Sequence, residues 1–455
     1  MLRVKLFVLS FLLSPWALGA TSFTRDKLPT GLDVVMMESH KVPLVTIVLA
    51  SKAGAMTETP DTNGLTHLWE HMFFKGNKTL KNQEAFNARI RELGIDYNGD
   101  TAEEKVRYYF TLPSVYLADG IRFMYDAISS PLLEQKELEK ERLVVMDEWD
   151  RNASDPSFNL YRLRDKLLYG DQEYLRDALG EREIIAKATR EQLLTIKDEV
   201  FTPSNSAIFV SGDFDPKDLK KLIHQYFSNW KDPKGWKPVV REEFPKFPST
   251  TDVVMTHPEA RNVQINATYE GPKAKEKPED TIIADVLLTL LQHKSGKFYK
   301  EYIDSGLTYG AGLSYPTQAH VGAIHVFAET KPENAKKVKQ MLLKEPEKWA
   351  KKGYFAASQL EDVRRSLLVG HKFEENEPSE YIKTLAFWWA VTGLDYYETY
   401  LDNLRKVSLE DVQAFAKRYF VDKPYVATTF LSPEDAAKIG MSDNSKPLLK
   451  KYFNI

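Results

Sequence analysis

The sequence contains no cysteine. A chain without cysteine cannot form disulfides, use a thiol nucleophile or hold zinc through thiolates. Any metal that it binds must therefore be held by histidine, aspartate or glutamate. The formal net charge is only −3, and no concentration of basic residues marks a nucleic-acid surface, so we expect no nucleic-acid partner.

Long apolar runs are also missing beyond the first twenty residues, although a membrane-spanning helix needs about 20 apolar residues. At the N-terminus, Arg3 and Lys5 precede a short apolar stretch at 6–13, and small residues follow up to Ala20. This pattern predicts a secretory signal peptide over 1–20. A retained anchor is the alternative, but the apolar stretch is short for a span. We expect an exported chain with no stable membrane span, periplasmic if the source is a Gram-negative bacterium.

The chain has 455 residues, more than the roughly 250–300 that one core usually covers, which predicts at least two domains. Apolar runs and helical periodicity locate the elements. We expect strands at 32–37, 44–49, 106–112, 206–211, 253–256, 262–269, 323–330 and 426–431. We expect helices at 83–93, 115–128, 134–152, 160–168, 190–199, 217–227, 278–303, 331–348 and 356–374, with others around Trp388 and before Tyr419.

The second half repeats the pattern of the first. Residues 188–216 and 407–435 both contain a helix with an aromatic end, then a strand, then a proline turn. This repetition predicts an α+β fold of two homologous, duplicated α/β-sandwich domains, each a mainly antiparallel sheet packed with helices. We expect a metal-binding domain at 21–230, a linker rich in proline and lysine at 231–250, and a second domain without a metal site at 251–455.

The strongest local motif is H-x-x-E-H at residues 67–71. His67 and His71 are four residues apart, so on a helix they lie on one face and can share a divalent cation, with Glu70 beside them as a base. Asn63 or Thr66 is expected to cap this helix. The alternative is an amphipathic helix whose histidines simply lie on its polar edge.

A catalytic zinc usually keeps three protein ligands and one open position, so the two histidines need a third ligand. Glu148 is the candidate, on the helix predicted at 134–152, with Glu141 seven residues earlier on the same face. Taken alone, glutamates on a charged helix are more often solvated than functional.

Several segments together resemble the pitrilysin/insulinase family of inverted zinc metallopeptidases, in its short branch that is similar to mitochondrial processing peptidases. The matching segments cover nearly the whole chain after the N-terminus, in order, and are more diffuse in the second half. They lie at 28–32, 64–77, 141–148, 202–215 and 306–309.

This resemblance implies roles for five residues. His67, His71 and Glu148 would hold one Zn²⁺ per chain, and Glu70 would be the general base that activates a water on the zinc. Glu141 would orient or tune the site.

The resemblance also implies how peptides bind. Asn98 matches the family's asparagine that holds the substrate backbone, and peptides bind extended by adding to a sheet edge. A closed chamber between two halves restricts substrates to unfolded peptides.

One position departs from the family pattern. Self-sufficient members carry an Arg and a Tyr seven residues apart that point at the scissile carbonyl. Tyr309 fits the tyrosine, but Tyr302 stands where arginine is expected. A donor to the oxyanion is commonly worth about 10²–10³ in rate, so the isolated chain is expected to be a poor enzyme. The alternative is that Tyr309 is an ordinary buried aromatic residue.

We therefore expect an exported zinc metalloendopeptidase that acts as the metal-bearing subunit of a heterodimer, whose homologous partner supplies the Arg/Tyr pair; a homodimer is also possible. One alternative is a non-catalytic peptide-binding or assembly subunit of the same fold. Another is a chance motif in an unrelated α+β binding protein, which explains neither Glu148 nor the duplication.

Overall fold

The computed structural model describes residues 23–240, 244, 247, 249–320 and 322–455. The signal peptide predicted at 1–20, and part of the linker predicted at 231–250, lie outside the described residues. Within the described part, no helix is both long enough and apolar enough to cross a lipid bilayer.

The first half is built on a six-stranded sheet with the order β1-β2-β6-β3-β5-β4. Its strands are β1 (Thr24–Lys27), β2 (Asp33–Glu38), β3 (Leu44–Ser51), β4 (Asp96–Thr101), β5 (Val106–Pro113) and β6 (Ser206–Gly212). Only β2 and β6 pair in parallel. Strand β5 alternates buried and half-buried residues, as expected for period-2 patterning. Strand β4 lies at the edge of the sheet.

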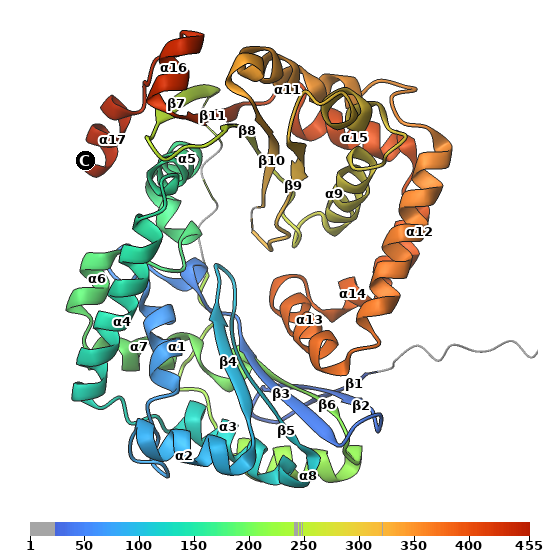
Figure 1. Cartoon of the computed structure of the whole chain (residues 1–455). Coiled ribbons are helices and arrows are strands. Elements are labelled where there is room, and N and C mark those ends of the chain that lie inside the picture. The colour runs from blue at the N-terminus through green and yellow to red at the C-terminus, as the bar shows by residue number, and fades with distance from the viewer. Residues whose placement is uncertain (1–22, 241–243, 245–246, 248, 321) are drawn as a thin grey trace, which may run out of the picture.

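Helices cover one face of this sheet (Figure 1). They are α1 (Leu65–Phe73), α2 (Gln83–Leu93), α3 (Leu117–Ser129), α7 (Arg190–Val200) and α8 (Pro216–Phe227). Fully buried Leu68 and Trp69 of α1 and Phe110 of β5 belong to the core between these layers. Burying such side chains contributes roughly 1.5–3 kcal/mol each, so this core fixes where α1 lies.

The second half has a five-stranded sheet with the order β7-β11-β8-β10-β9. Its strands are β7 (Thr251–Thr256), β8 (Val263–Glu270), β9 (Gly310–Ser314), β10 (Ala323–Thr330) and β11 (Tyr425–Leu431). Again only one pair, β11 with β7, is parallel. This order matches β2-β6-β3-β5-β4 strand for strand. The predicted α+β class, with two mainly antiparallel sheets covered by helices, is confirmed.

Helices pack on this second sheet too, and short ones end the chain. The main helices on this sheet are α9 (Pro278–Leu291), α11 (Ala335–Trp349) and α15 (Leu409–Tyr419). The short helices at the end of the chain are α16 (Pro433–Ile439) and α17 (Lys446–Phe453). Short helices α6 (Arg182–Lys187) and α10 (Lys297–Tyr299), and a helical segment at Gly170–Arg176, lie in the connections between the larger elements.

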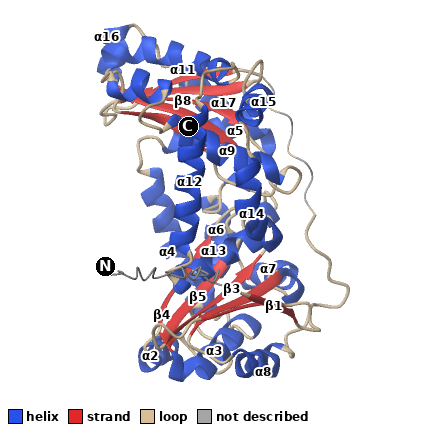
Figure 2. Ribbon diagram, turned by 90° about the vertical axis from the view of Figure 1, so that its right-hand side faces the viewer, coloured by secondary structure: helices blue, strands red, loops and turns tan. Residues whose placement is uncertain are grey.

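The two halves exchange helices across the molecule (Figures 1 and 2). Helix α5 (Phe158–Tyr169), which follows α4 (Gln135–Ala153), packs Leu160 and Leu163 with Val253 of the second sheet. In return α13 (Pro378–Val391) packs on the first sheet. Helix α12 (Ala357–Glu374) precedes it in the chain and α14 (Leu394–Lys406) follows it. Each sheet is therefore covered partly by the other half, and the boundaries 21–230 and 251–455 stay a prediction.

Some predicted elements differ from the structure. The single helix expected at 278–303 is wrong, because α9 ends at Leu291 and a separate short helical segment begins at Lys297. The residues between them include Gly296, which has low helix propensity. Strands β1, β4 and β9 and helix α14 were not predicted. The strands are short or lack apolar alternation, so periodicity does not reveal them.

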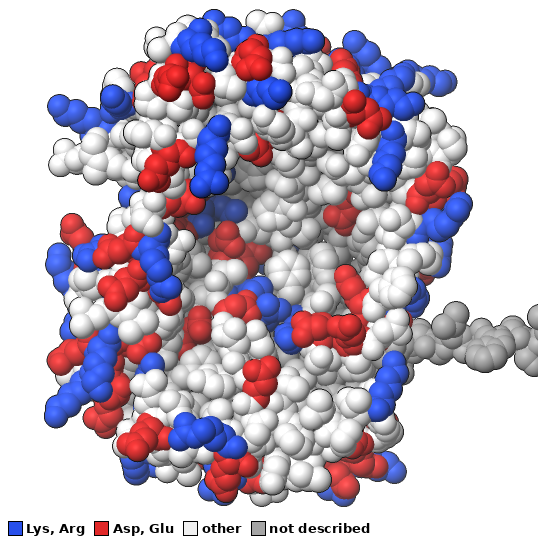
Figure 3. Space-filling view, in the orientation of Figure 1, with Lys and Arg blue, Asp and Glu red and all other residues white. Residues whose placement is uncertain are grey.

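The molecule is hollowed between its two halves, and side chains of both charge signs surround the hollow (Figure 3).

Candidate metal centre

A buried carboxylate fixes the start of α1. Gly64 adopts a left-handed conformation (φ 92°) just before the helix. Glu58, 2% exposed, accepts hydrogen bonds from the Gly64 N–H at 2.8 Å and the Thr66 N–H at 2.7 Å. The side chains of Asn63 and Thr66 also donate to this carboxylate, so the prediction that either one caps the helix is wrong. A carboxylate here satisfies free N–H groups and complements the helix dipole.

Three predicted ligands converge between α1 and α4. The Nε2 atoms of His67 and His71 are 3.2 Å apart. The Glu148 Oε2 atom lies 3.7 Å from Nε2 of His67 and 3.5 Å from Nε2 of His71. Among the residues that the structure describes, these form the only group of three or more potential metal ligands.

The donor set fits a zinc ion. Two ligands bound at about 2.0–2.2 Å in tetrahedral geometry lie about 3.3–3.6 Å apart, close to the distances between these three atoms. Burial, together with the nearby His71, lowers the pKa of His67 to about 3, so this imidazole is neutral at neutral pH, as a metal ligand must be. All three side chains are half-buried, which leaves one side open to a further ligand.

Glu141 and Lys75 support the second histidine. Glu141, 5% exposed, accepts a hydrogen bond from Nδ1 of His71 at 2.9 Å, and its other oxygen lies 2.7 Å from Nζ of Lys75. Burial acts to raise the pKa of Glu141, but the hydrogen bonds from His71 and Lys75 outweigh it and hold the pKa below its usual value. An ionised Glu141 keeps the proton of His71 on Nδ1 and frees Nε2 for a metal. The alternative of a solvated surface residue is wrong for Glu141.

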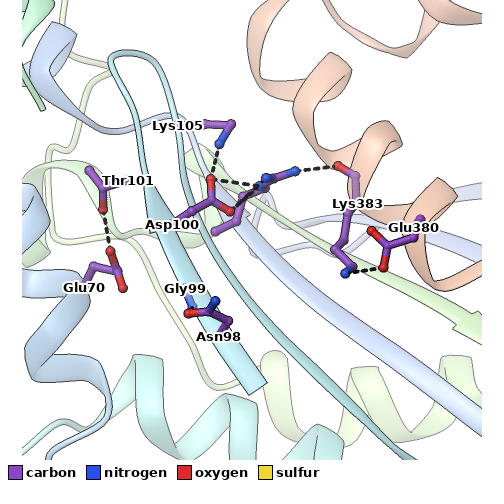
Figure 4. A network of polar contacts seen from close by, with 9 residues as sticks. Glu70, Asn98, Gly99, Asp100, Thr101, Lys105, Glu380 and Lys383 are labelled. Carbon is purple, nitrogen blue, oxygen red and sulfur yellow. Dashed lines mark hydrogen bonds and ion pairs between the residues drawn. The ribbon is translucent and has the colours of Figure 1, made fainter. Parts of the chain in front are cut away.

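Glu70 directly precedes the ligand His71 in the sequence. Its side chain lies against strand β4 (Figure 4). It is 8% exposed, and its Oε2 accepts a hydrogen bond from the Thr101 hydroxyl at 3.1 Å. Burial raises the pKa of Glu70 to about 7. A carboxyl group with a pKa near neutrality can both take up and release a proton, as a general base must.

Asn98 lies on β4, the edge strand next to Glu70, and its side chain is exposed. Its Oδ1 accepts a hydrogen bond from the Gly99 N–H at 2.9 Å. In the described sheet β4 pairs only with β5, so its other edge presents unpaired backbone groups that could receive an extended peptide.

The two tyrosines of the second half behave differently. Tyr309 is 57% exposed, so the alternative of an ordinary buried aromatic is wrong. Tyr302, in contrast, is 0% exposed, and its hydroxyl donates to Oε2 of Glu345 at 3.2 Å. Tyr302 is held inside the second core and presents no donor at the surface.

Sequence reasoning missed Glu58, Lys75 and Thr101. Lys75 lies two residues beyond the end of α1, so helical spacing gave no signal for its contact with Glu141. Glu58 and Thr101 contact α1 from separate segments, and no spacing in the sequence points to either contact.

Two family models match the chain. One, described as insulinase (peptidase family M16), matches residues 33–177, and the other, described as the peptidase M16 inactive domain, matches residues 187–367. The chain belongs to this insulinase, or pitrilysin, family of peptidases.

Similar proteins and solved structures include several proteases. An uncharacterized zinc protease of Rickettsia felis is 27% identical over 210 residues, 46% of this chain and 51% of that protein, so the chain spans about half of that relative's length. The zinc protease PqqE of Helicobacter pylori is 24% identical over 450 residues, covering 91% of this chain and 96% of that protein. The first half of the periplasmic protease PqqL from Escherichia coli superposes with a TM-score of 0.75 at 19% identity, covering 95% of this chain and 97% of that one, which shows the shared fold.

Proposed function

We propose that the chain is a zinc metalloendopeptidase that hydrolyses unfolded peptides. The observation that carries this proposal is the convergence of His67, His71 and Glu148, from two helices, with Glu70 beside them. One Zn²⁺ per chain would be held by the two Nε2 atoms and the Glu148 carboxylate. The naming of relatives as zinc proteases supports the choice of metal.

The residues around the ion would divide the work of peptide hydrolysis. The bound ion supplies a Lewis acid that activates water and polarises the scissile carbonyl. Glu70, beside the ligands, would take the proton of the attacking water and later give it to the leaving amine. Glu141 keeps His71 in the tautomer whose Nε2 is free.

Substrate would pair with the free edge of β4, where Asn98 holds its backbone. Pairing through the main chain demands an extended segment, so a folded protein would not fit. The hollow between the halves supports the same restriction (Figure 3).

We further propose that the active form is a heterodimer. The arginine expected seven residues before Tyr309 is replaced by Tyr302, which is buried and bonded to Glu345 and so cannot reach a substrate carbonyl. A homologous partner that carries the Arg/Tyr pair would supply that donor; a homodimer would leave it missing. Export, to the periplasm if the source is Gram-negative, is proposed from the N-terminal signal pattern, and the periplasmic relative supports it.

Replacement of Glu70 by Gln tests the central assignment. We expect Glu70→Gln to bind one zinc per chain, as the wild type does, and to lose about 10²–10⁴ of kcat on an unstructured fluorogenic peptide, because the base is gone. Zinc content by plasma emission spectrometry and initial rates, with and without an Arg/Tyr-bearing homologue, are the measurements. Glu84→Gln, an exposed position in the first turn of α2, is the matched control and should keep full activity. Undiminished cleavage by Glu70→Gln would refute the base assignment.

A second candidate is a non-catalytic peptide-binding or assembly subunit, and the burial of Tyr302 favours it. In that case the chain would bind peptides, but cleavage in the presence of a partner would not depend on Glu70. The same variant therefore separates the two candidates.

A further inference from the structure

Strand β4 contacts the proposed base directly. Neighbouring residues of a strand point to opposite faces, so Gly99 and Thr101 face one way and Asn98 and Asp100 the other. Gly99 and Thr101 face α1, which carries Glu70 (Figure 4).

The contact between Glu70 and this strand is close. A Cβ atom added at Gly99 would lie 2.5 Å from Oε1 of Glu70, so the carboxylate rests on bare backbone. The other oxygen, Oε2, accepts the Thr101 hydroxyl at 3.1 Å. Within the described residues this hydroxyl is the only hydrogen-bond donor to the Glu70 carboxylate.

A single donor can determine where a buried carboxylate points. An ionised carboxylate that is 8% exposed requires a polar partner, and loss of its only donor leaves the group free to seek another. Beside a bound dication the available partner is the ion itself, which would take Glu70 as a further ligand in the position that a catalytic site leaves open.

The opposite face of β4 is braced by the other half of the molecule. Asp100 accepts a hydrogen bond from Nε of Arg107 at 2.9 Å and forms an ion pair with Lys105. Nη1 of Arg107 in turn donates to the backbone oxygen of Lys383 on α13 at 2.8 Å. The strand that positions Thr101 is thus held from both faces (Figure 4).

We propose that Thr101 is a positioning residue for Glu70: its hydroxyl holds the base against the same strand edge that receives the peptide. The base and the scissile bond are then placed by one backbone segment, so a peptide in the correct register on β4 is also in register with Glu70. This inference rests on the proposed peptidase function.

Three variants of the full chain test the proposal. Thr101→Val keeps the shape but removes the donor, Thr101→Ser keeps the donor, and Thr111→Val removes a hydroxyl of β5 that bonds to Thr46 at 2.9 Å instead. We expect Thr101→Val to lower kcat about 10- to 100-fold, because that loss corresponds to the free energy of one hydrogen bond to a charged group. KM should change little. Thr101→Ser should restore most of the rate, and Thr111→Val should keep it.

A crystal structure of zinc-loaded Thr101→Val gives a readout independent of turnover. We expect the Glu70 carboxylate to have left β4, whereas it stays there in Thr101→Ser. A Thr101→Val enzyme with wild-type kcat, or an unmoved carboxylate, would overturn the proposal. If the wild-type chain cleaves no peptide with or without a partner, the proposed function fails, while the position of the carboxylate still decides the role of Thr101.

Discussion

At the scale of single residues, the site depends on charges that support one another. Glu141 lies 2.9 Å from Nδ1 of His71 and 2.7 Å from Nζ of Lys75. These contacts are on the side of the His71 ring opposite the Nε2 atom that faces the other ligands. An unpaired buried carboxylate is costly, so Lys75 lets Glu141 stay ionised, and Glu141 in turn orients the imidazole. The proposed metal centre therefore depends on Glu141 and Lys75 as well as on the three ligands.

Lys75 should therefore affect metal binding without touching the metal. We expect Lys75→Met to weaken zinc binding about 10- to 100-fold, because Glu141 loses the charge that keeps it ionised. Competition with a chromophoric chelator measures this affinity. Lys78→Met, three residues further on and exposed, is the matched control. Equal zinc affinity in Lys75→Met and the wild type would show that the contact with Glu141 is incidental.

At the scale of elements, two helices and one edge strand bring the site together. Helix α1 carries the histidines and Glu70, α4 carries Glu141 and Glu148, and β4 carries Asn98 and Thr101. Local patterns predicted α4 to within about one residue of each end, and they predicted a helix at the metal motif without fixing its ends. They did not predict β4, because its sequence, DYNGDT, has no apolar alternation and its residues are exposed or half-buried. An edge strand with one paired neighbour is specified mainly by tertiary contacts.

The brace on β4 predicts a pH-dependent stability. Burial acts to raise the pKa of Asp100, but Lys105 and Arg107 outweigh it and lower the pKa below 3.8. A carboxyl group whose pKa is lowered by folding stabilises the fold above its unfolded-state pKa and loses that contribution as the pH falls through the folded-state value. We expect Asp100→Asn to lower the free energy of unfolding of the metal-free chain by about 1 kcal/mol at pH 7, since the group is partly exposed.

Urea unfolding of wild type and Asp100→Asn at pH 7, 5 and 3 measures this effect. The difference should persist from pH 7 to pH 5 and shrink at pH 3. Asp61→Asn, at an exposed loop position, should show no difference at any of the three. A difference that grows on acidification would contradict the assigned direction of the shift.

At the scale of the whole molecule, the exchange of α5 and α13 ties the halves together. Ile382 and Leu385 of α13, both 0% exposed, belong to the same core as Val48 and Phe209 of the first sheet. Leu160 and Leu163 of α5 make the corresponding contact with the second sheet. Neither sheet can bury both faces within its own half, so we expect one cooperative unfolding transition.

Leu385→Ala tests this coupling. We expect a loss of about 2–5 kcal/mol in the free energy of unfolding, as for other large-to-small changes in a core. The transition should remain single when followed by far-ultraviolet circular dichroism and by tryptophan fluorescence. Phe373→Ala, on α12 and 69% exposed, is the control and should change stability by less than about 0.5 kcal/mol. Two separate transitions in the wild type would show that the halves fold independently.

The sequence by itself determined the features that depend on local pattern: the metal motif on one helix face, most helices and buried strands, and the repeated order of elements, because periodicity and spacing act within a few residues. Glu148 was assigned by resemblance to a family, and only the structure placed it near the histidines. Tertiary structure decided the contacts of Glu58 and Thr101 with α1. It also decided the burial of Tyr302 and the exchange of α5 and α13. These contacts join segments far apart in the chain, and the free energy that selects them comes from packing rather than from the local sequence.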